Sequence, residues 1–188
     1  MSSKDLILSK IKAVPLEPKD IPIIPDFETD GDLTANFTAS IQANKGEVIS
    51  KDALKSLLDS GVFEKVYSRV AEYSSFSNTA FPEDAHQLND LNLAILRGQF
   101  GVAENGAIWL EDPDMGLRAL PFITEHLVIV LDSDQLVGNM HQAYQRIGKK
   151  TSGFGLFLAG PSKTADIEQS LVIGAHGAKS LRVVLRQK

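Results

Sequence analysis

The best candidate for a binding site is the loop Gly160-Pro161-Ser162-Lys163-Thr164. It follows an apolar run typical of a strand and precedes a predicted helix at about residues 165–173. In open α/β sheets ligands bind outside the carboxyl ends of strands, and a helix N-terminus offers free N–H groups to an anion. We therefore interpret the loop as an anion site, to which its hydroxyl and ammonium groups add donors. The alternative is a tight turn in which Thr164 caps the helix and Asp166 complements its dipole.

A second candidate is the segment Gly174-Ala175-His176-Gly177, which should return the chain to the sheet near strand ends. Imidazole titrates near neutral pH, so His176 could act as an acid, a base or an anion donor. Gly177 and its small neighbours would let a ligand or the backbone approach closely. The alternative is that the glycines end the preceding helix and His176 only packs or caps.

Two further charged side chains lie in the central section, Glu104 and Arg118. A carboxylate at a strand end can act as a base or bind hydroxyls, although Glu104 could equally be a solvated hairpin residue. Arg118 could hold a carboxylate or phosphate through two parallel hydrogen bonds, or be an exposed loop arginine. Glu125-His126 could form a paired site or mark the polar entrance to a buried strand.

Composition argues against several classes of function. The chain has no cysteine, so thiol nucleophiles, disulfides and iron–sulfur ligands would have to come from other chains. Its four histidines lack the spacing of a zinc motif, and its glycine-rich loops match neither the Walker nor the dinucleotide-binding pattern. We therefore predict no metal site and no resident cofactor. A formal charge of -5 with scattered basic residues argues against nucleic acid as a partner.

No segment approaches the roughly 20 consecutive apolar residues that a membrane helix needs. The first residues also lack the long apolar region of a secretory signal. We therefore expect a cytoplasmic protein without membrane insertion.

The elements that must position these loops follow from apolar periodicity. Helices are predicted at residues 5–11, 33–41 and 51–58, the last capped by Ser50, and another should begin near Ser133. Strands are predicted at residues 46–49, 66–67, 91–96, 126–131, 154–158 and 181–185. Asn105-Gly106 between two β-compatible runs predicts a central β-hairpin with a type I′ turn.

Strands that alternate with helices indicate an α/β fold, a three-layer α/β/α sandwich with a mostly parallel sheet and the central β-hairpin. Residues 154–185 should form a β-loop-α-β unit whose two strands run parallel in one sheet. Residues 1–30 form a predicted N-terminal helix and proline-rich arm, and residues 31–188 a single domain.

Taken together, the loops resemble the LUD-domain, or lactate utilization protein C, family. The resemblance is strongest over about residues 90–186, and the run from Gly160 to Glu168 followed by Gly-Ala-His-Gly is its most specific part. The chain departs from the family pattern at Asn105, Ala107 and Ala178, where two threonines and a proline are usual. The loss of two hydroxyls could alter the ligand or the activity.

The resemblance implies a fold of the NagB/RpiA/CoA transferase-like kind and a role in L-lactate utilization. It also implies cysteine-rich iron–sulfur partner proteins, with which the chain would help to oxidise lactate to pyruvate as an accessory or ligand-binding subunit. One alternative is a stand-alone enzyme of the same superfamily that acts on a phosphorylated or acyl metabolite. The other is a non-catalytic regulatory binding protein.

Loop position then motivates hypotheses for individual residues. We expect a small carboxylate or phosphate-bearing ligand, with Glu104 and His176 as candidate catalytic residues that transfer or orient protons. The candidate ligand-binding residues are Arg118, Gly160, Ser162, Lys163, Thr164, Asp166 and Gly177.

Overall fold

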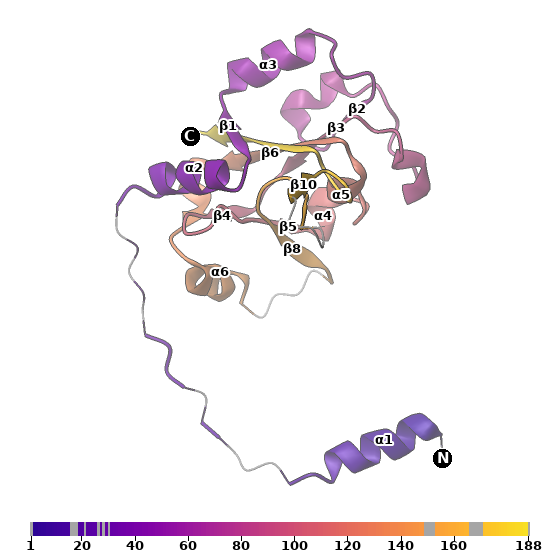
Figure 1. Ribbon diagram of the computed structural model, residues 1–188, viewed down its shortest axis with the longest axis vertical. Helices are drawn as coiled ribbons and strands as arrows, with labels where there is room; N and C mark the ends of the chain where they lie inside the picture. The colour runs from indigo at the N-terminus through magenta and orange to yellow at the C-terminus, as the bar shows by residue number, and fades with distance from the viewer. Residues whose placement is uncertain are drawn as a thin grey trace.

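The fold is described from a computed structural model of the chain (Figure 1). The structure describes residues 2–15, 19–20, 22–25, 27, 29, 31–148, 153–165 and 171–187, and only the backbone of residues 164, 165 and 171. Within these ranges no helix has both the length and the apolar character needed to cross a membrane.

Five parallel strands form the central sheet, in the order β1-β11-β6-β3-β2. Their bounds are β1 Glu47–Ile49, β2 Val66–Ser68, β3 Leu93–Arg97, β6 His126–Asp132 and β11 Ser180–Arg186. Every residue of β6 after His126 is buried. A strand with neighbours on both edges and layers on both faces excludes water, which explains this uninterrupted apolar run. The prediction of a mixed α/β fold with a mostly parallel central sheet is confirmed.

A smaller sheet of four strands lies against one face of the central sheet, in the order β7-β4-β5-β8. Its strands are β4 Phe100–Val102, β5 Ile108–Glu111, β7 Leu136–Val137 and β8 Gly155–Leu158. β8 pairs antiparallel with β5, whereas β11 pairs with β6 and β1 in the central sheet. The prediction that residues 154–158 and 181–185 are parallel strands of one sheet is therefore wrong.

β4 and β5 form the predicted central hairpin, but its turn is not type I′. Gly106 has a φ of +69°, whereas Asn105 does not have the positive φ that a type I′ turn also requires. Instead the Asn105 side chain accepts a hydrogen bond from the N–H of Ala107 at 3.0 Å, and Gly106 N donates to Val102 O at 2.9 Å. Asn105 thus forms an Asx turn, and the loop that joins β4 to β5 is longer than two residues.

Helices cover both faces of the central sheet (Figure 1). One face packs against α3 (Lys51–Asp59) and the 3₁₀ helix η1 (Ala71–Phe76). The other face packs against α2 (Leu33–Ala43), the short helices α4 (Asp112–Met115) and α5 (Leu120–Ile123), and the small sheet. The remaining helices are α1 (Ser3–Lys12), α6 (Met140–Ile147), η2 (Ala85–Leu88) and η3 (Ser133–Gln135).

The predicted periodicity of α2 and α3 is confirmed. Phe37 and Ile41 of α2 are fully buried, and Leu54 and Leu58 of α3 are also buried. Ser50 caps α3 by accepting a hydrogen bond from Ala53 N at 3.1 Å. The helix expected near Ser133 begins later, at Met140. The residues between them form η3 and β7, because β7 pairs with β4 and the Asn139 side chain caps α6.

The helix predicted at residues 165–173 is wrong at both of its described ends. β9 (Lys163–Ala165) and β10 (Leu171–Ile173) are antiparallel strands, with Lys163 opposite Ile173. Valine and isoleucine at the end of β10 favour extended backbone, and so short an apolar run fits a strand as well as a helix. Asp166, a candidate ligand-binding residue, lies outside the described residues.

Candidate functional site

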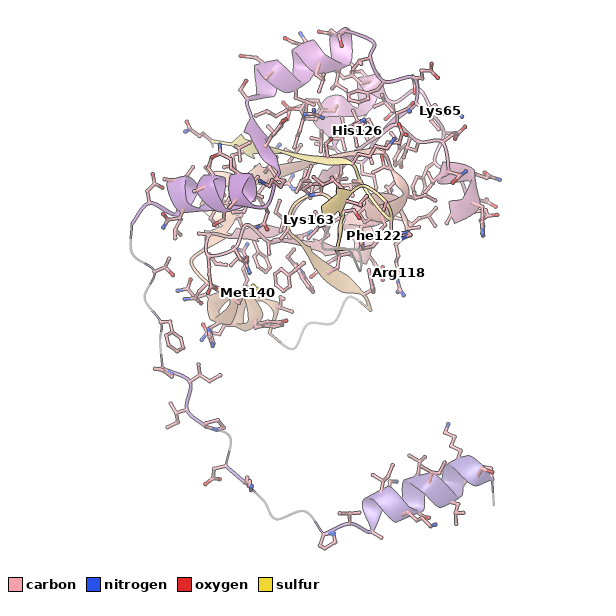
Figure 2. All side chains as sticks on the ribbon, in the orientation of Figure 1. Lys65, Arg118, Phe122, His126, Met140 and Lys163 are labelled. Carbon is pink, nitrogen blue, oxygen red and sulfur yellow. The ribbon has the colours of Figure 1, made fainter. Side chains whose placement is uncertain are left out.

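A cavity of about 300 Å³ opens between the small sheet and the amino ends of two inner strands of the central sheet, β6 and β11. Its wall comes from the end of α5, from β8 with the loop that follows, and from the segment before β11. Figure 2 labels Lys163 and Phe122, which lie on two of these segments. The described lining residues are Pro121, Phe122, Leu127, Leu156, Phe157, Leu158, Ala159, Gly160, Pro161, Ser162, Lys163, His176, Gly177, Ala178 and Leu181.

The cavity lies only partly where the sequence predicted it. The loop that begins at Gly160 does follow the carboxyl end of a strand, but that strand is β8 of the small sheet. The central sheet contributes Leu127 and Leu181, which stand near the amino ends of β6 and β11. The cavity therefore lies where the small sheet approaches the amino ends of β6 and β11, and not at the carboxyl ends of the parallel strands.

Five of the nine candidate residues line this cavity together: Gly160, Ser162, Lys163, His176 and Gly177. Among the described lining residues Lys163 is the one side chain of fixed charge, and none is acidic. Lys163 and His176 are exposed, so both can reach a ligand at the mouth. An ammonium without an acidic neighbour in the lining favours an anionic ligand.

Asn44, the residue that ends α2, holds the Lys163 side chain in place. The Lys163 ammonium donates to Asn44 Oδ1 at 3.0 Å. The Asn44 amide group donates to Asn105 O at 2.8 Å and to Ser40 O at 3.1 Å. Asn44 thus connects α2 with the hairpin turn and with residues 160–164, the candidate anion loop.

Close contacts with neighbouring segments explain both candidate glycines. Gly160 has a φ of +82°, and a Cβ added there would lie 2.4 Å from the carbonyl oxygen of Asn44. A Cβ on Gly177 would lie 2.9 Å from Cβ of Ser162. The two loops are also bonded directly, because Ser162 N donates to Ala178 O at 2.9 Å. The small residues here therefore permit two segments of the chain to approach each other closely.

Glu104 and Arg118 are not part of the cavity wall, and each has another partner. The exposed Glu104 accepts a hydrogen bond from Met140 N at 3.0 Å, where it caps α6. Arg118 forms a two-fold hydrogen bond with Asp112, 2.8 Å at each contact, and its guanidinium lies over the ring of Phe154. This pairing raises the pKa of Arg118 and lowers that of Asp112. The roles predicted for Glu104 and Arg118 stay predictions.

Thr164 belongs to β9 by its backbone, and its side chain is outside what the structure describes. The anion loop therefore leads into a strand, so it gains no donors from a helix N-terminus. The Ser162 N–H is already bonded to Ala178 O. The Lys163 ammonium is therefore the charged donor that the described lining offers to an anion.

Glu125 and His126, considered as a paired site, have separate partners. Glu125 accepts from Lys179 at 2.7 Å and from Asn92 at 3.1 Å, and these bonds lower its pKa. His126 Nδ1 lies 2.8 Å from the hydroxyl of Ser180. Burial of the ring lowers the pKa of His126, and the nearby positive charge of Arg182 lowers it further, by a smaller amount. Among the described residues, no group of three or more His, Asp or Glu side chains could hold a metal ion.

The residues that sequence reasoning missed are Asn44 and the apolar wall of the cavity. Asn44 follows the predicted helix at a position where asparagine commonly ends helices, but no sequence signal connects it to Lys163. The wall residue Phe122 is 46% exposed, which is unusual for a large apolar side chain beside a polar loop.

The model of the LUD domain family matches residues 43–185 of the chain. Lactate utilization protein C of Bacillus pumilus is 28% identical over 118 residues, which cover 56% of this chain and 49% of the relative. Lactate utilization protein C of Deinococcus radiodurans is 32% identical over 108 residues, 55% of this chain and 51% of the relative. The uncharacterized protein YkgG of Escherichia coli is 28% identical over 102 residues, 50% of this chain and 44% of the relative. These matches span about half the length of each curated relative.

A solved structure has the same fold. The crystal structure of a DUF162 family protein from Deinococcus radiodurans superimposes with a TM-score of 0.60 at 17% identity. The superposition covers 83% of this chain and 96% of the other. Since the family model covers the central sheet, the small sheet and all the described lining of the cavity, the chain belongs to the LUD domain family.

Proposed function

We propose that the cavity binds a small carboxylate or phosphate anion and that the chain serves as a ligand-binding component of a lactate-utilization system. The observation that carries the proposal is the Lys163 ammonium at the mouth of a cavity whose described lining has no acidic side chain. A hydrogen bond between an ammonium and an anionic oxygen is about twice as strong as a neutral one. Asn44 orients this ammonium through its side-chain oxygen.

The remaining wall suits a short organic anion. The volume of about 300 Å³ lies at the lower end of the range, about 300–1,000 Å³, that is usual for ligand pockets. Lys163 would pair with the anionic oxygens, Ser162 would donate a hydrogen bond, and His176 would orient or exchange a proton at the mouth. Phe122 and the leucines of the wall would contact the carbon skeleton.

We propose this system because relatives of the chain are named lactate utilization protein C. This chain has no cysteine, so it supplies no thiolate ligand for an iron–sulfur cluster. We infer that cysteine-rich iron–sulfur partner chains carry the electrons, and that this chain holds lactate, pyruvate or a related anion for them.

A thermal-shift series on the purified chain tests the ligand class, because a ligand that binds the folded state raises the melting temperature. The probes are lactate, pyruvate, inorganic phosphate, a sugar phosphate and a CoA ester. A saturable shift with one of the small anions supports the proposal. No shift with any of them contradicts it, and turnover of a sugar phosphate or CoA ester by the chain alone favours a stand-alone enzyme.

A further inference from the structure

The N-terminus of helix α1 is capped, but an apolar stripe along the helix is exposed to solvent. The Ser2 side chain and Asp5 form a capping box, and basic residues occupy the last turn. None of the residues of α1 is buried. Ile7 and Ile11 of the helix, with Val14 just beyond it, recur on one helical face and are 58%, 62% and 57% exposed. Figure 1 shows α1 apart from the two sheets.

A helix of this length needs a packing partner to be stable in water. Isolated helices shorter than about 12–15 residues are marginal even when they are rich in alanine. α1 has 10 residues and includes two isoleucines, whose helix propensity is only moderate. Capping favours the helix, but burial of the stripe would have to supply most of its stability.

An apolar groove lies along α6. It has a volume of about 540 Å³ and is lined by Ile24, Met140, His141, Tyr144 and Gln145. The four residues from α6 stand at helical spacing on the face away from the buried Ala143. Tyr144 and Ile24 are 63% and 60% exposed, so the apolar wall of the groove is open to solvent. Figure 2 labels Met140 in the first turn of α6.

The segment that leads from α1 to the sheets is anchored at the start of the same helix. Asn139 Nδ2 donates to Phe27 O at 2.7 Å, and the Phe27 ring lies 4.8 Å from that of His141. A Cβ on Gly138 would lie 2.0 Å from Thr29 Oγ1, which shows how closely this segment crosses the β7–α6 corner. The tether of α1 therefore leaves the body beside the groove.

We propose that α1 packs its stripe of Ile7, Ile11 and Val14 into the α6 groove of its own chain. The stretch from Val14 to Ile24 can span at most about 33–36 Å, and α1 is about 15 Å long, so the groove is within reach. The tether joins α1 to Ile24, which itself lines the groove, and this covalent link favours the chain's own groove over that of a second copy. The docked helix would contact Tyr144, whose ring lies 5.8 Å from Phe157 in the wall of the anion cavity.

Amide hydrogen exchange on the full chain tests the docking. At low micromolar concentration, we expect the amides of α1 to exchange at least tenfold more slowly than unstructured amides of the same sequence. Replacing the stripe by Ile7→Gln with Ile11→Gln keeps helix propensity but removes the apolar contact, and should abolish this protection. The matched control, Ser9→Gln with Lys12→Gln on the opposite face, should retain it.

A groove variant, Tyr144→Gln, completes the test because this exposed side chain can change without disturbing the core. We expect it to abolish protection in α1 and to leave exchange in β6 unchanged. Three results would overturn the proposal: no protection of α1 in the wild-type chain, full protection in Tyr144→Gln, or protection that disappears on dilution. The last result would mean that a second copy supplies the groove.

Discussion

The Lys163 ammonium lies 3.0 Å from the side-chain oxygen of Asn44, a residue 119 positions earlier in the chain. This contact fixes the cation of the candidate site to the end of α2. Asn44 also holds the carbonyl of Asn105, so the hairpin turn and the anion loop share one support. The position of Lys163 therefore depends on a side chain that is itself absent from the lining of the cavity.

Asn44→Ala should weaken both the fold and the site. It removes three side-chain hydrogen bonds, and we expect a loss of about 1.5–4.5 kcal/mol in the free energy of unfolding, since a single such bond contributes about 0.5–1.5 kcal/mol. Lys163 would lose its orientation, so anion affinity should also fall. Urea denaturation and anion titration measure the two effects, with the exposed Asn89→Ala as control. Unchanged affinity would show that Lys163 needs no support from Asn44.

Gly160→Ala should destabilise the chain more than Gly61→Ala. Both glycines have positive φ, which costs a non-glycine residue roughly 1–2 kcal/mol. A Cβ at position 160 would also lie 2.4 Å from Asn44 O, whereas one at position 61 would meet nothing within 4 Å. The difference between the two midpoints in urea therefore isolates the steric contact. Equal losses would contradict the close approach of the two loops.

Glu104→Ala tests whether the carboxylate acts in the site or only at a helix end. Glu104 accepts from Met140 N, so its loss should cost about 0.5–2 kcal/mol, as for other N-terminal caps. Anion affinity should change by less than about twofold, a difference of roughly 0.4 kcal/mol. A large loss of affinity with an unchanged melting temperature would instead support the catalytic or binding role predicted from the sequence.

The sequence predicted those elements whose pattern reflects burial alone. The apolar run of β6, the spacing of Phe37 and Ile41 in α2, and the Ser50 cap of α3 each follow from local periodicity or local hydrogen bonding. Burial on both faces of the central sheet leaves a clear signal in these segments. Loop position and family resemblance also pointed to Gly160, Ser162, Lys163, His176 and Gly177, which line one cavity, and their roles in binding stay predictions.

The elements that sequence reasoning misplaced depend on contacts between distant segments. β7 is extended because it pairs with β4, and β8 belongs to the small sheet because β5 provides its partner. β10 is a strand because its residues face β9, although a short apolar run is equally consistent with a helix. The contact between Asn44 and Lys163 is of the same kind, since neither residue carries a local signal for the other.

His126 predicts a change of stability with pH. Burial and the nearby Arg182 lower its pKa below the ordinary value of 6.5. The imidazole therefore binds a proton less tightly in the folded state than in the unfolded state. Well above pH 6.5 the ring is neutral in both the folded and the unfolded state and contributes nothing to the change of stability with pH. As the pH falls below 6.5 the unfolded state gains protons first, and stability is lost. Melting temperatures should therefore fall on acidification.

The variant His126→Gln should remove this contribution while keeping a partner for the Ser180 hydroxyl. The difference in melting temperature, wild type minus variant, should be constant above about pH 7. It should decrease as the pH is lowered from about 6.5 to about 5, the range in which histidine titrates. The exposed His86→Gln serves as control. Parallel curves for wild type and His126→Gln would show that burial of His126 does not affect folding.

Calorimetric titration of the wild type and of Lys163→Gln with lactate, pyruvate and inorganic phosphate tests the central claim most directly. We expect saturable binding of at least one of these anions and an affinity at least about tenfold weaker in Lys163→Gln, a loss of about 1.4 kcal/mol. The same change of charge on the far side of the central sheet, Lys55→Gln, should leave the affinity unchanged. Equal binding by wild type and Lys163→Gln would contradict an anion site built around Lys163.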